Sequence, residues 1–308
     1  MNASVDATIV ITTKDRKDDL RTALQSAVNQ TASVEVLVID DGSTDGTAAM
    51  VQSEFPSVRL HREERSAGLI VRRNQAARLA TGSILFSIDD DAEFTSPHVV
   101  AQTLEEFAHP DVGAVAIPYV DVRKSPEVKQ QAPDDNAIYC TALFRGTAHA
   151  LRRKLFLKLG GYRDALVHQG EEMDYCIRML DAGAVVRLGS SDVIYHYESP
   201  RRDFERWDYY GARNTVFFEW RYPPAHHLPI RLLGTIANTI RTMANNGRMV
   251  HLARGLFDGL TACFSGHIER NPVRPDTYEL FRVLKKTSAT KMADVQPLLP
   301  NHNRSHLA

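Results

Sequence analysis

The sequence predicts an α/β protein built on a doubly wound parallel sheet, followed by a helical region. Three observations predict this fold class. Apolar strand-like runs alternate with helical segments over the first 120 residues, several runs lead directly into polar or acidic residues, and the pattern turns helical after residue 200. A strand–helix–strand order of this kind is typical of parallel sheets with right-handed crossovers and helices on both faces.

Four short apolar runs predict the first strands, and Val58–His61 gives the weakest signal. The runs are continuous rather than alternating, as expected for strands that are buried on both faces of a sheet. They are Ala7–Thr13, Val34–Ile39, Val58–His61 and Ser83–Ile88. Apolar residues at helical spacing predict the connecting helices, over Asp15–Asn29, Thr47–Phe55 and Gly68–Ala80.

The second half of the chain predicts a mixture of strands and helices before the helical region. We expect strands over Val112–Val120 and Asn136–Phe144, with a charged loop over Asp121–Asp135 between them, and a later strand that ends at His196. The expected helices are Arg152–Leu159, Gly170–Ala182, Asp203–Arg221, Leu228–Asn245, Met249–Phe264 and Asp276–Lys286. We therefore divide the chain into residues 1–200 and 201–308, and expect the last dozen residues to be disordered.

The composition is that of an ordinary globular protein. The 308 residues are 43% hydrophobic and 24% charged, which excludes a disordered, collagenous or disulfide-dense chain. No apolar run is long enough to cross a bilayer, no signal peptide is visible, and the three cysteines lack metal spacing, so we expect a cytoplasmic location. Residues 1–200 carry a balance of −8 and residues 201–308 a balance of +7.

Polar residues follow three of the predicted strands. Thr12–Thr13, Asp40–Asp41 and Asp89–Asp91 fall at carboxyl ends of strands, where open α/β sheets bind their ligands. Three adjacent carboxylates can hold Mg²⁺ or Mn²⁺, or can form a solvated acidic turn, and the residues alone favour neither. The Asp40–Asp41 turn can receive a nucleotide or cap the next helix. The sequence there is neither a Walker loop nor a dinucleotide fingerprint.

Four segments together resemble one known family. They occur in order within about residues 5–220 and read TIVITTKDRKDDL, VEVLVIDDGSTDGT, SAGLIVRRNQAARLATGSILFSIDDDAEF and LGGYRDALVHQGEEMDYCIRMLDAGAVV. They resemble the inverting family 2 glycosyltransferases, which have the GT-A fold. The resemblance implies a nucleotide-binding sheet that becomes mixed in its second half. It also implies transfer of a sugar from a nucleoside diphosphate donor to an acceptor hydroxyl, usually with Mg²⁺ or Mn²⁺.

The resemblance also implies roles for individual residues. Glu172, the second residue of an acidic pair with Glu171, matches the catalytic base, and a base is what direct displacement by a hydroxyl requires. Asp91 matches the metal ligand, and His196 either joins the metal or is a structural histidine. The expected nucleotide-binding residues are Thr12, Thr13, Arg16, Asp41, Arg73, Asp89 and Asp90. The Glu171–Glu172 pair and Arg213–Asn214 give a preference for rhamnosyltransferase-like members.

Two other functions stay open at this point. A sugar-phosphate nucleotidyltransferase uses a related sheet, but Thr12–Lys14 is not the glycine-rich loop that such enzymes carry after the first strand. A non-catalytic protein that binds nucleotide sugars would not need Asp91 and Glu172, and both are present. Transfer of a labelled sugar distinguishes the three.

The partners that the sequence implies are a dTDP, UDP or GDP sugar and a glycan or lipid-linked acceptor, in polysaccharide or glycolipid assembly; we expect no nucleic acid. The basic carboxyl-terminal helices carry apolar positions, among them Ile230, Leu232, Leu233 and Ile240. These positions either lie on an anionic membrane, at the inner face that borders the cytoplasm, or they are buried by packing. In the second case they pack on the catalytic domain or on a second copy of the chain. Packing is the favoured expectation.

Overall fold

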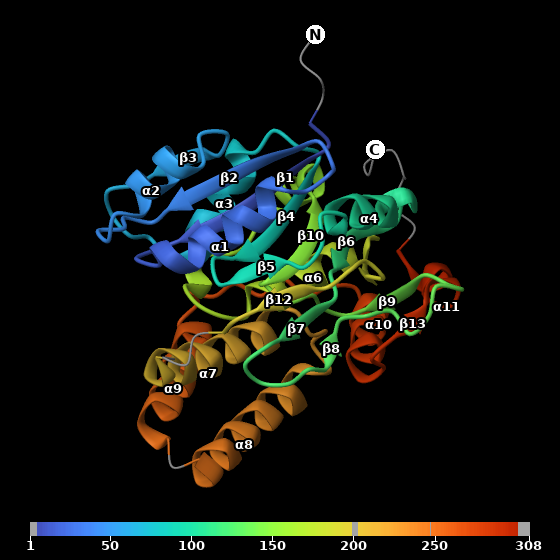
Figure 1. Cartoon of the computed structure of the whole chain (residues 1–308). Coiled ribbons are helices and arrows are strands. Elements are labelled where there is room, and N and C mark those ends of the chain that lie inside the picture. The colour runs from blue at the N-terminus through green and yellow to red at the C-terminus, as the bar shows by residue number, and fades with distance from the viewer. Residues whose placement is uncertain (1–4, 199–202, 247, 301–308) are drawn as a thin grey trace.

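Strands and helices alternate through the amino-terminal part of the molecule (Figure 1). The computed structural model describes residues 5–198, 203–246 and 248–300. In chain order the first elements are β1 (Ala7–Thr13), α1 (Lys17–Val28), β2 (Val34–Asp40), α2 (Thr47–Glu54), β3 (Arg59–Arg62), α3 (Leu69–Leu79) and β4 (Ile84–Asp89). All seven predicted elements are confirmed, with ends that differ by at most two residues. Every residue of β1 is buried, which explains its unbroken apolar pattern.

The middle of the chain departs further from the prediction. The run Val112–Val120 forms two strands in different sheets, because the chain turns at Pro118, which cannot donate to a strand ladder. The elements are β5 (Ala92–Phe94), α4 (Val99–Glu105), β6 (Val112–Ala116), β7 (Tyr119–Asp121), β8 (Val128–Lys129), β9 (Tyr139–Thr141), β10 (Ala148–Arg152), α5 (Arg153–Lys158), α6 (Glu171–Asp181), β11 (Val185–Leu188) and β12 (Ile194–His196). The charged segment 121–135 thus contains β8 rather than being loop throughout.

The carboxyl-terminal part is mainly helical and returns to the sheet at its end. Its elements are α7 (Phe204–Arg221), α8 (Leu228–Asn246), α9 (Met249–Phe264), α10 (Pro275–Lys286), β13 (Thr290–Lys291) and α11 (Met292–Val295). The two-residue strand β13 pairs with β9, which the helical pattern did not predict. Of the dozen residues expected to be disordered, Leu298 ends a short 3-10 helix that begins at Gln296, and residues 301–308 lie outside the described residues.

The described strands form two sheets. The larger has the order β13-β9-β11-β6-β10-β4-β1-β2-β3. Strands β1 to β4 are parallel, whereas β10 runs antiparallel to both β4 and β6, so the expected mixed second half is confirmed. Thr13 lies beside Asp40 and Thr12 beside Asp89 in the register. The carboxyl ends of these strands therefore converge as predicted.

A smaller sheet, in the order β5-β12-β7-β8, lies next to this edge (Figure 1). Strand β12 is antiparallel to β5 and parallel to β7. Its last residue, His196, stands opposite Ala92 on one side and Asp121 on the other. Because Ala92 directly follows Asp91, this register brings a histidine from far along the chain to the acidic end of β4.

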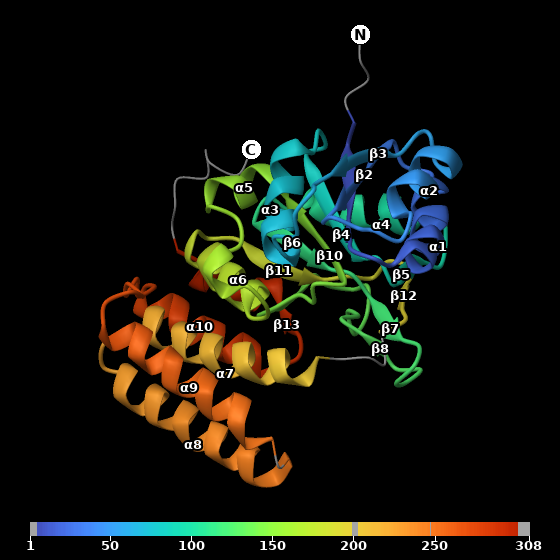
Figure 2. The same ribbon diagram turned by 90° about the vertical axis from the view of Figure 1, so that its left-hand side faces the viewer.

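Helices α7, α8 and α9 pack against one another at the end of the molecule away from β1–β3 (Figures 1 and 2). Gly255 and Gly259 of α9 are buried against α7, where an added Cβ would meet the backbone of Tyr209 or the side chain of Val216. The absence of side chains at these positions lets the two helix backbones approach closely. This contact fixes the rotation of α9.

We predict that Gly255→Ala destabilises the protein by about 1–3 kcal/mol, because its methyl group would overlap the carbonyl oxygen of Tyr209. Gly234→Ala is the matched control: no heavy atom of another group lies within 4 Å of its added Cβ on α8, so it should stabilise by roughly 0.5–1 kcal/mol. Urea unfolding measures both. Equal effects of the two substitutions would contradict the described α7–α9 contact.

Candidate active site

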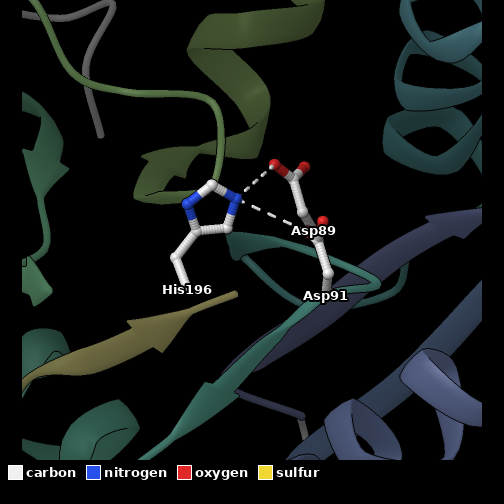
Figure 3. A group of neighbouring side chains, drawn as sticks. All are labelled: Asp89, Asp91 and His196. Carbon is white, nitrogen blue, oxygen red and sulfur yellow. Dashed lines mark ion pairs between the residues drawn. The ribbon is translucent and has the colours of Figure 1, made fainter. Parts of the chain in front are cut away.

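Two carboxylates and one imidazole meet at the carboxyl end of β4 (Figure 3). Asp89, Asp91 and His196 each offer one ligand atom, and these three atoms lie within 4.8 Å of one another. The Nε2 atom of His196 is 3.4 Å from Asp91 Oδ1 and 4.0 Å from Asp89 Oδ2. Two carboxylate oxygens and one imidazole nitrogen are a donor set that divalent cations such as Mn²⁺ accept. The prediction placed Asp89 with the nucleotide only, whereas the geometry places it in this cluster as well.

The other face of His196 is held by a carboxylate that the sequence analysis did not single out. Asp121 Oδ1 lies 2.6 Å from His196 Nδ1, and Lys129 donates a 2.7 Å hydrogen bond to Asp121 Oδ2. Metal-binding histidines are commonly oriented in this way, which leaves Nε2 for the ion. The residues thus fit a divalent cation. Burial lowers the pKa of His196, but the neighbouring carboxylates raise it to about 8 overall.

Asp90 points to a different set of partners. Its carboxylate accepts 2.8 Å hydrogen bonds from the hydroxyl of Thr13 and from Arg16, which also donates to Asp91. Burial raises the pKa of Asp90 to about 7, although Arg16 opposes the shift. In Asp91, burial is outweighed by the hydrogen bonds from His196 and Arg16, and the pKa falls to about 2. The three adjacent aspartates therefore have different environments, and three of the predicted residues, Thr13, Arg16 and Asp90, lie together.

Asp41 is engaged by the loop that precedes α3. It accepts hydrogen bonds from the hydroxyl of Ser66, from the backbone N–H groups of Ala67 and Gly68, and from Arg72. Burial opposes ionisation, but these donors lower the pKa of Asp41 overall. In this structure the carboxylate fixes the loop between β3 and α3, a role that the sequence pattern did not predict.

Arg73 connects the end of β4 with the beginning of α6. Its guanidinium is buried and donates a 2.7 Å hydrogen bond to Asp89 and a 2.9 Å hydrogen bond to the carbonyl oxygen of Gly146. Its Nη1 atom lies 3.8 Å from a carboxylate oxygen of Glu171. A predicted nucleotide-binding residue is thus also the link between the two groups of acidic side chains.

Glu171 and Glu172 have different surroundings. Glu171 is buried, and one of its oxygens has no hydrogen-bond partner. Glu172 is half-buried, and no other described residue forms a hydrogen bond or ion pair with it. A Cβ added at Gly146 would lie 2.5 Å from Glu172 Oε1 and 2.8 Å from Arg73 Nη1, so both groups converge above this glycine. Burial raises the pKa of each glutamate, and Arg73 opposes the shift.

The loop before this glutamate pair has an unusual backbone. Val167 (φ 62°), Gln169 (φ 67°) and Gly170 (φ 84°) all have positive φ, and Val167 is the central residue of a tight turn in which His168 N–H donates to Leu166. A β-branched residue in this conformation is strained. The buried Asn214 of α7 holds the loop: its Nδ2 atom lies 2.7–2.9 Å from the carbonyl oxygens of residues 166, 168 and 169.

The mixed sheet with its cluster of two aspartates and a histidine defines the chain as an α/β protein with a candidate metal site, and comparisons identify the family. The family model of glycosyl transferase family 2 matches residues 8–161, half of the chain. This chain belongs to that family. It is similar to an uncharacterized glycosyltransferase, YibD, of Escherichia coli, with 33% identity over 97 residues, covering 30% of this chain and 28% of that protein.

Two further similarities extend over more of the chain. The succinoglycan biosynthesis protein ExoU of Rhizobium meliloti is 27% identical over 207 residues, or 60% of each protein. The chain thus spans less than two thirds of either relative. The mannosyltransferase PcManGT from Pyrobaculum calidifontis, solved with GDP-Man and Mn²⁺, aligns with a TM-score of 0.57 and 21% identity, over 92% of this chain and 84% of that one. The expected GT-A fold is confirmed.

We predict that Asn214→Ala frees the strained loop, because three backbone carbonyl groups lose a buried donor. Stability should fall by about 1–3 kcal/mol, the usual cost of unsatisfied buried groups. Hydrogen exchange should become faster at residues 166–170. Asn238→Ala, at an exposed position of α8, is the control. Unchanged exchange in Asn214→Ala would show that this side chain does not hold the loop.

Proposed function

We propose that this protein transfers a sugar from a nucleoside diphosphate sugar to an acceptor hydroxyl, with inversion at the anomeric carbon and Glu172 as the general base. One observation carries the proposal: an unpaired, half-buried carboxylate lies beside Arg73, which also contacts the Asp89–Asp91–His196 cluster through Asp89. Metal-type ligands and a free base at one sheet edge are what direct displacement of a diphosphate requires.

The donor nucleotide is assigned to the carboxyl edge of β1, β2 and β4. Thr12, Thr13, Arg16 and Arg73 supply hydroxyl and guanidinium donors there, while Asp41 and Asp90 shape the site through the contacts described above. The donor class is a dTDP, UDP or GDP sugar. The mannosyltransferase of similar fold was solved with GDP-Man. This supports a nucleoside diphosphate sugar as the donor but does not select its nucleotide base.

Asp89, Asp91 and His196 would hold a divalent cation, Mg²⁺ or Mn²⁺. When bound, such an ion stabilises negative charge on the departing diphosphate. Asp121 positions His196 through its Nδ1 atom, and Arg16 offsets the charge of Asp90 and Asp91. The Mn²⁺ in the mannosyltransferase of similar fold supports the assignment.

Glu172 would take the proton of the acceptor hydroxyl while that oxygen forms its bond to the anomeric carbon. The bond from this carbon to the phosphate oxygen breaks at the same time, and its electron pair leaves with the diphosphate. A raised carboxyl pKa suits a base because proton transfer is most effective when the pKa approaches the working pH. Glu171, packed near Arg73, is better placed to hold that guanidinium than to react.

The acceptor is assigned to a glycan or a lipid-linked glycan in polysaccharide or glycolipid assembly, at the cytoplasmic side of the membrane. The similarity to a succinoglycan biosynthesis protein supports polysaccharide assembly. None of the described helices has both the length and the hydropathy that crossing a bilayer requires. Membership of glycosyl transferase family 2 favours sugar transfer over nucleotidyl transfer or binding alone.

Glu172→Gln removes the proton acceptor and keeps the side-chain size. We predict donor binding close to the unmodified protein and sugar transfer lowered by about 10²-fold or more, the usual scale for loss of a general base. Isothermal titration with the nucleotide and a transfer assay with the labelled donor measure the two effects. Glu171→Gln is the comparison. If Glu171→Gln loses sugar transfer while Glu172→Gln keeps it, Glu171 rather than Glu172 is the general base.

Asp91→Asn removes one charged ligand of the proposed cation. We expect donor turnover to be abolished and nucleotide affinity to become independent of Mn²⁺. Titrating UDP and dTDP binding against Mn²⁺ concentration measures the coupling. The control is Asp18→Asn, because Asp18 is an aspartate of α1 with an 84% exposed side chain. Equal nucleotide affinity with and without Mn²⁺ in the unmodified protein would refute the metal assignment.

A further inference from the structure

The outward face of α8 is apolar. Ile230, Leu233 and Ile240 are exposed, and together with Ala237 they follow the three- and four-residue spacing that places side chains on one side of a helix. The opposite face buries Leu232 together with Thr235 and Thr239. A helix of a soluble protein ordinarily buries its large aliphatic side chains and exposes its polar ones. Here two threonines are buried and three aliphatic side chains face solvent.

The outward face of α9 has the same character. Val250, Phe257 and Phe264 are separated by seven residues each, so they share one side of the helix. The opposite side is fixed against α7 by Gly255 and Gly259. Because that contact requires residues without side chains, α9 cannot turn its phenylalanines inward without losing it.

These two faces stand out in the described part of the chain by how far their apolar side chains are exposed. Among the described residues, the five most exposed large hydrophobic side chains all lie on α8 or α9, with 66–72% of their surface exposed: Ile230, Leu233, Val250, Phe257 and Phe264. Figures 1 and 2 show the two helices at the end of the molecule away from β1–β3. We expected this apolar face to pack on the catalytic domain or on a second copy of the chain. The first alternative is wrong for these positions, although Leu232 does pack inward, and the second is tested below.

The charge of the α8–α9 hairpin, Leu228–Phe264, indicates its partner. It contains four arginines and one acidic residue, Asp258. Arg231 and Arg248 are ion-paired with Glu219 and Asp208 of α7, so Arg241 and Arg254 are the basic side chains left to a partner. Arg241 is exposed beside Ile240, and no other described residue pairs with it. Arg254 has a 72% exposed side chain that lies 3.7 Å from the partly exposed Asp258 and over the ring of Tyr209, so water reaches most of its surface. A symmetric contact between two copies of this face would bring like charges together, which is costly, whereas an anionic surface would complement them.

We propose that the α8–α9 hairpin docks on an anionic lipid bilayer. The aliphatic and aromatic side chains of the two outward faces would enter the headgroup region, and Arg241 and Arg254 would pair with lipid phosphates. Amphipathic helices bind membranes through this combination of apolar area and basic charge. The contact would hold the active site near lipid-linked acceptors, but it does not depend on the proposed sugar transfer and is tested without it.

Co-sedimentation with vesicles tests the proposal. The full chain is mixed with vesicles of phosphatidylcholine and phosphatidylglycerol in equal amounts, or of phosphatidylcholine alone. We expect pelleting with the anionic vesicles at low salt, and loss of pelleting at high salt because counterions screen the arginines. An absence of pelleting with anionic vesicles at low salt would overturn the proposal.

Variants assign the binding to this surface. Replacing Arg241 and Arg254 together by Gln should lower the partition coefficient by roughly 30-fold, from the usual contribution of each basic residue near an anionic surface. Leu233→Ser combined with Phe257→Ser should also abolish pelleting, and both positions are exposed, so the fold should persist. The control is Val283→Ser, since Val283 is an exposed apolar residue of α10.

Two outcomes of these measurements would contradict the proposal. Vesicle binding that is the same in all variants would place the membrane contact elsewhere. Alternatively, the protein does not bind vesicles, and sedimentation velocity shows a concentration-dependent dimer that Leu233→Ser with Phe257→Ser abolishes. This result would assign the face to a second copy of the chain. A monomer that binds anionic vesicles through these residues is the expected result.

Discussion

The site depends on one buried ion-pair network, that of Arg73. A guanidinium that is buried away from solvent is stable only when hydrogen-bond acceptors or carboxylates surround it. Those of Arg73 come from three segments: Asp89 at the end of β4, the carbonyl oxygen of Gly146 before β10, and Glu171 at the start of α6. Elements that are far apart in the sequence are thereby held at fixed separation. Removing either carboxylate would leave a buried charge short of partners.

This network separates two kinds of carboxylate. Asp89 and Asp91 face His196 and suit a cation, whereas Glu172 stays unpaired on the far side of Arg73. The positive charge between the two groups limits their mutual repulsion. It also limits how far burial raises the pKa of the glutamates. The helical part of the chain contributes here too, because Asn214 of α7 holds the strained loop that leads into α6.

The sequence predicted the amino-terminal sheet well because buried parallel strands are continuous apolar runs and their carboxyl ends meet by topology. Asp89, Asp91 and His196 were identified for that reason and by family resemblance. Asp121 was missed, although it too follows a predicted strand, because only the β7–β12 pairing shows that it faces His196. The γ-turn at Val167 and the role of Asn214 were also missed, since neither leaves a periodic signal. The outward faces of α8 and α9 could not be predicted, because helical spacing shows a stripe but not what covers it.

A crystal structure with Mn²⁺ and an unreactive nucleoside diphosphate sugar would show whether the cation and the base lie where we propose. Anomalous scattering locates the ion independently of the protein atoms. We expect the ion to lie among Asp89, Asp91 and His196. We also expect His196 Nδ1 to keep its hydrogen bond to Asp121 and the carboxylate of Glu172 to face the anomeric carbon. An ion bound elsewhere, or a sugar whose anomeric carbon faces away from Glu172 in a catalytically competent crystal, would contradict it.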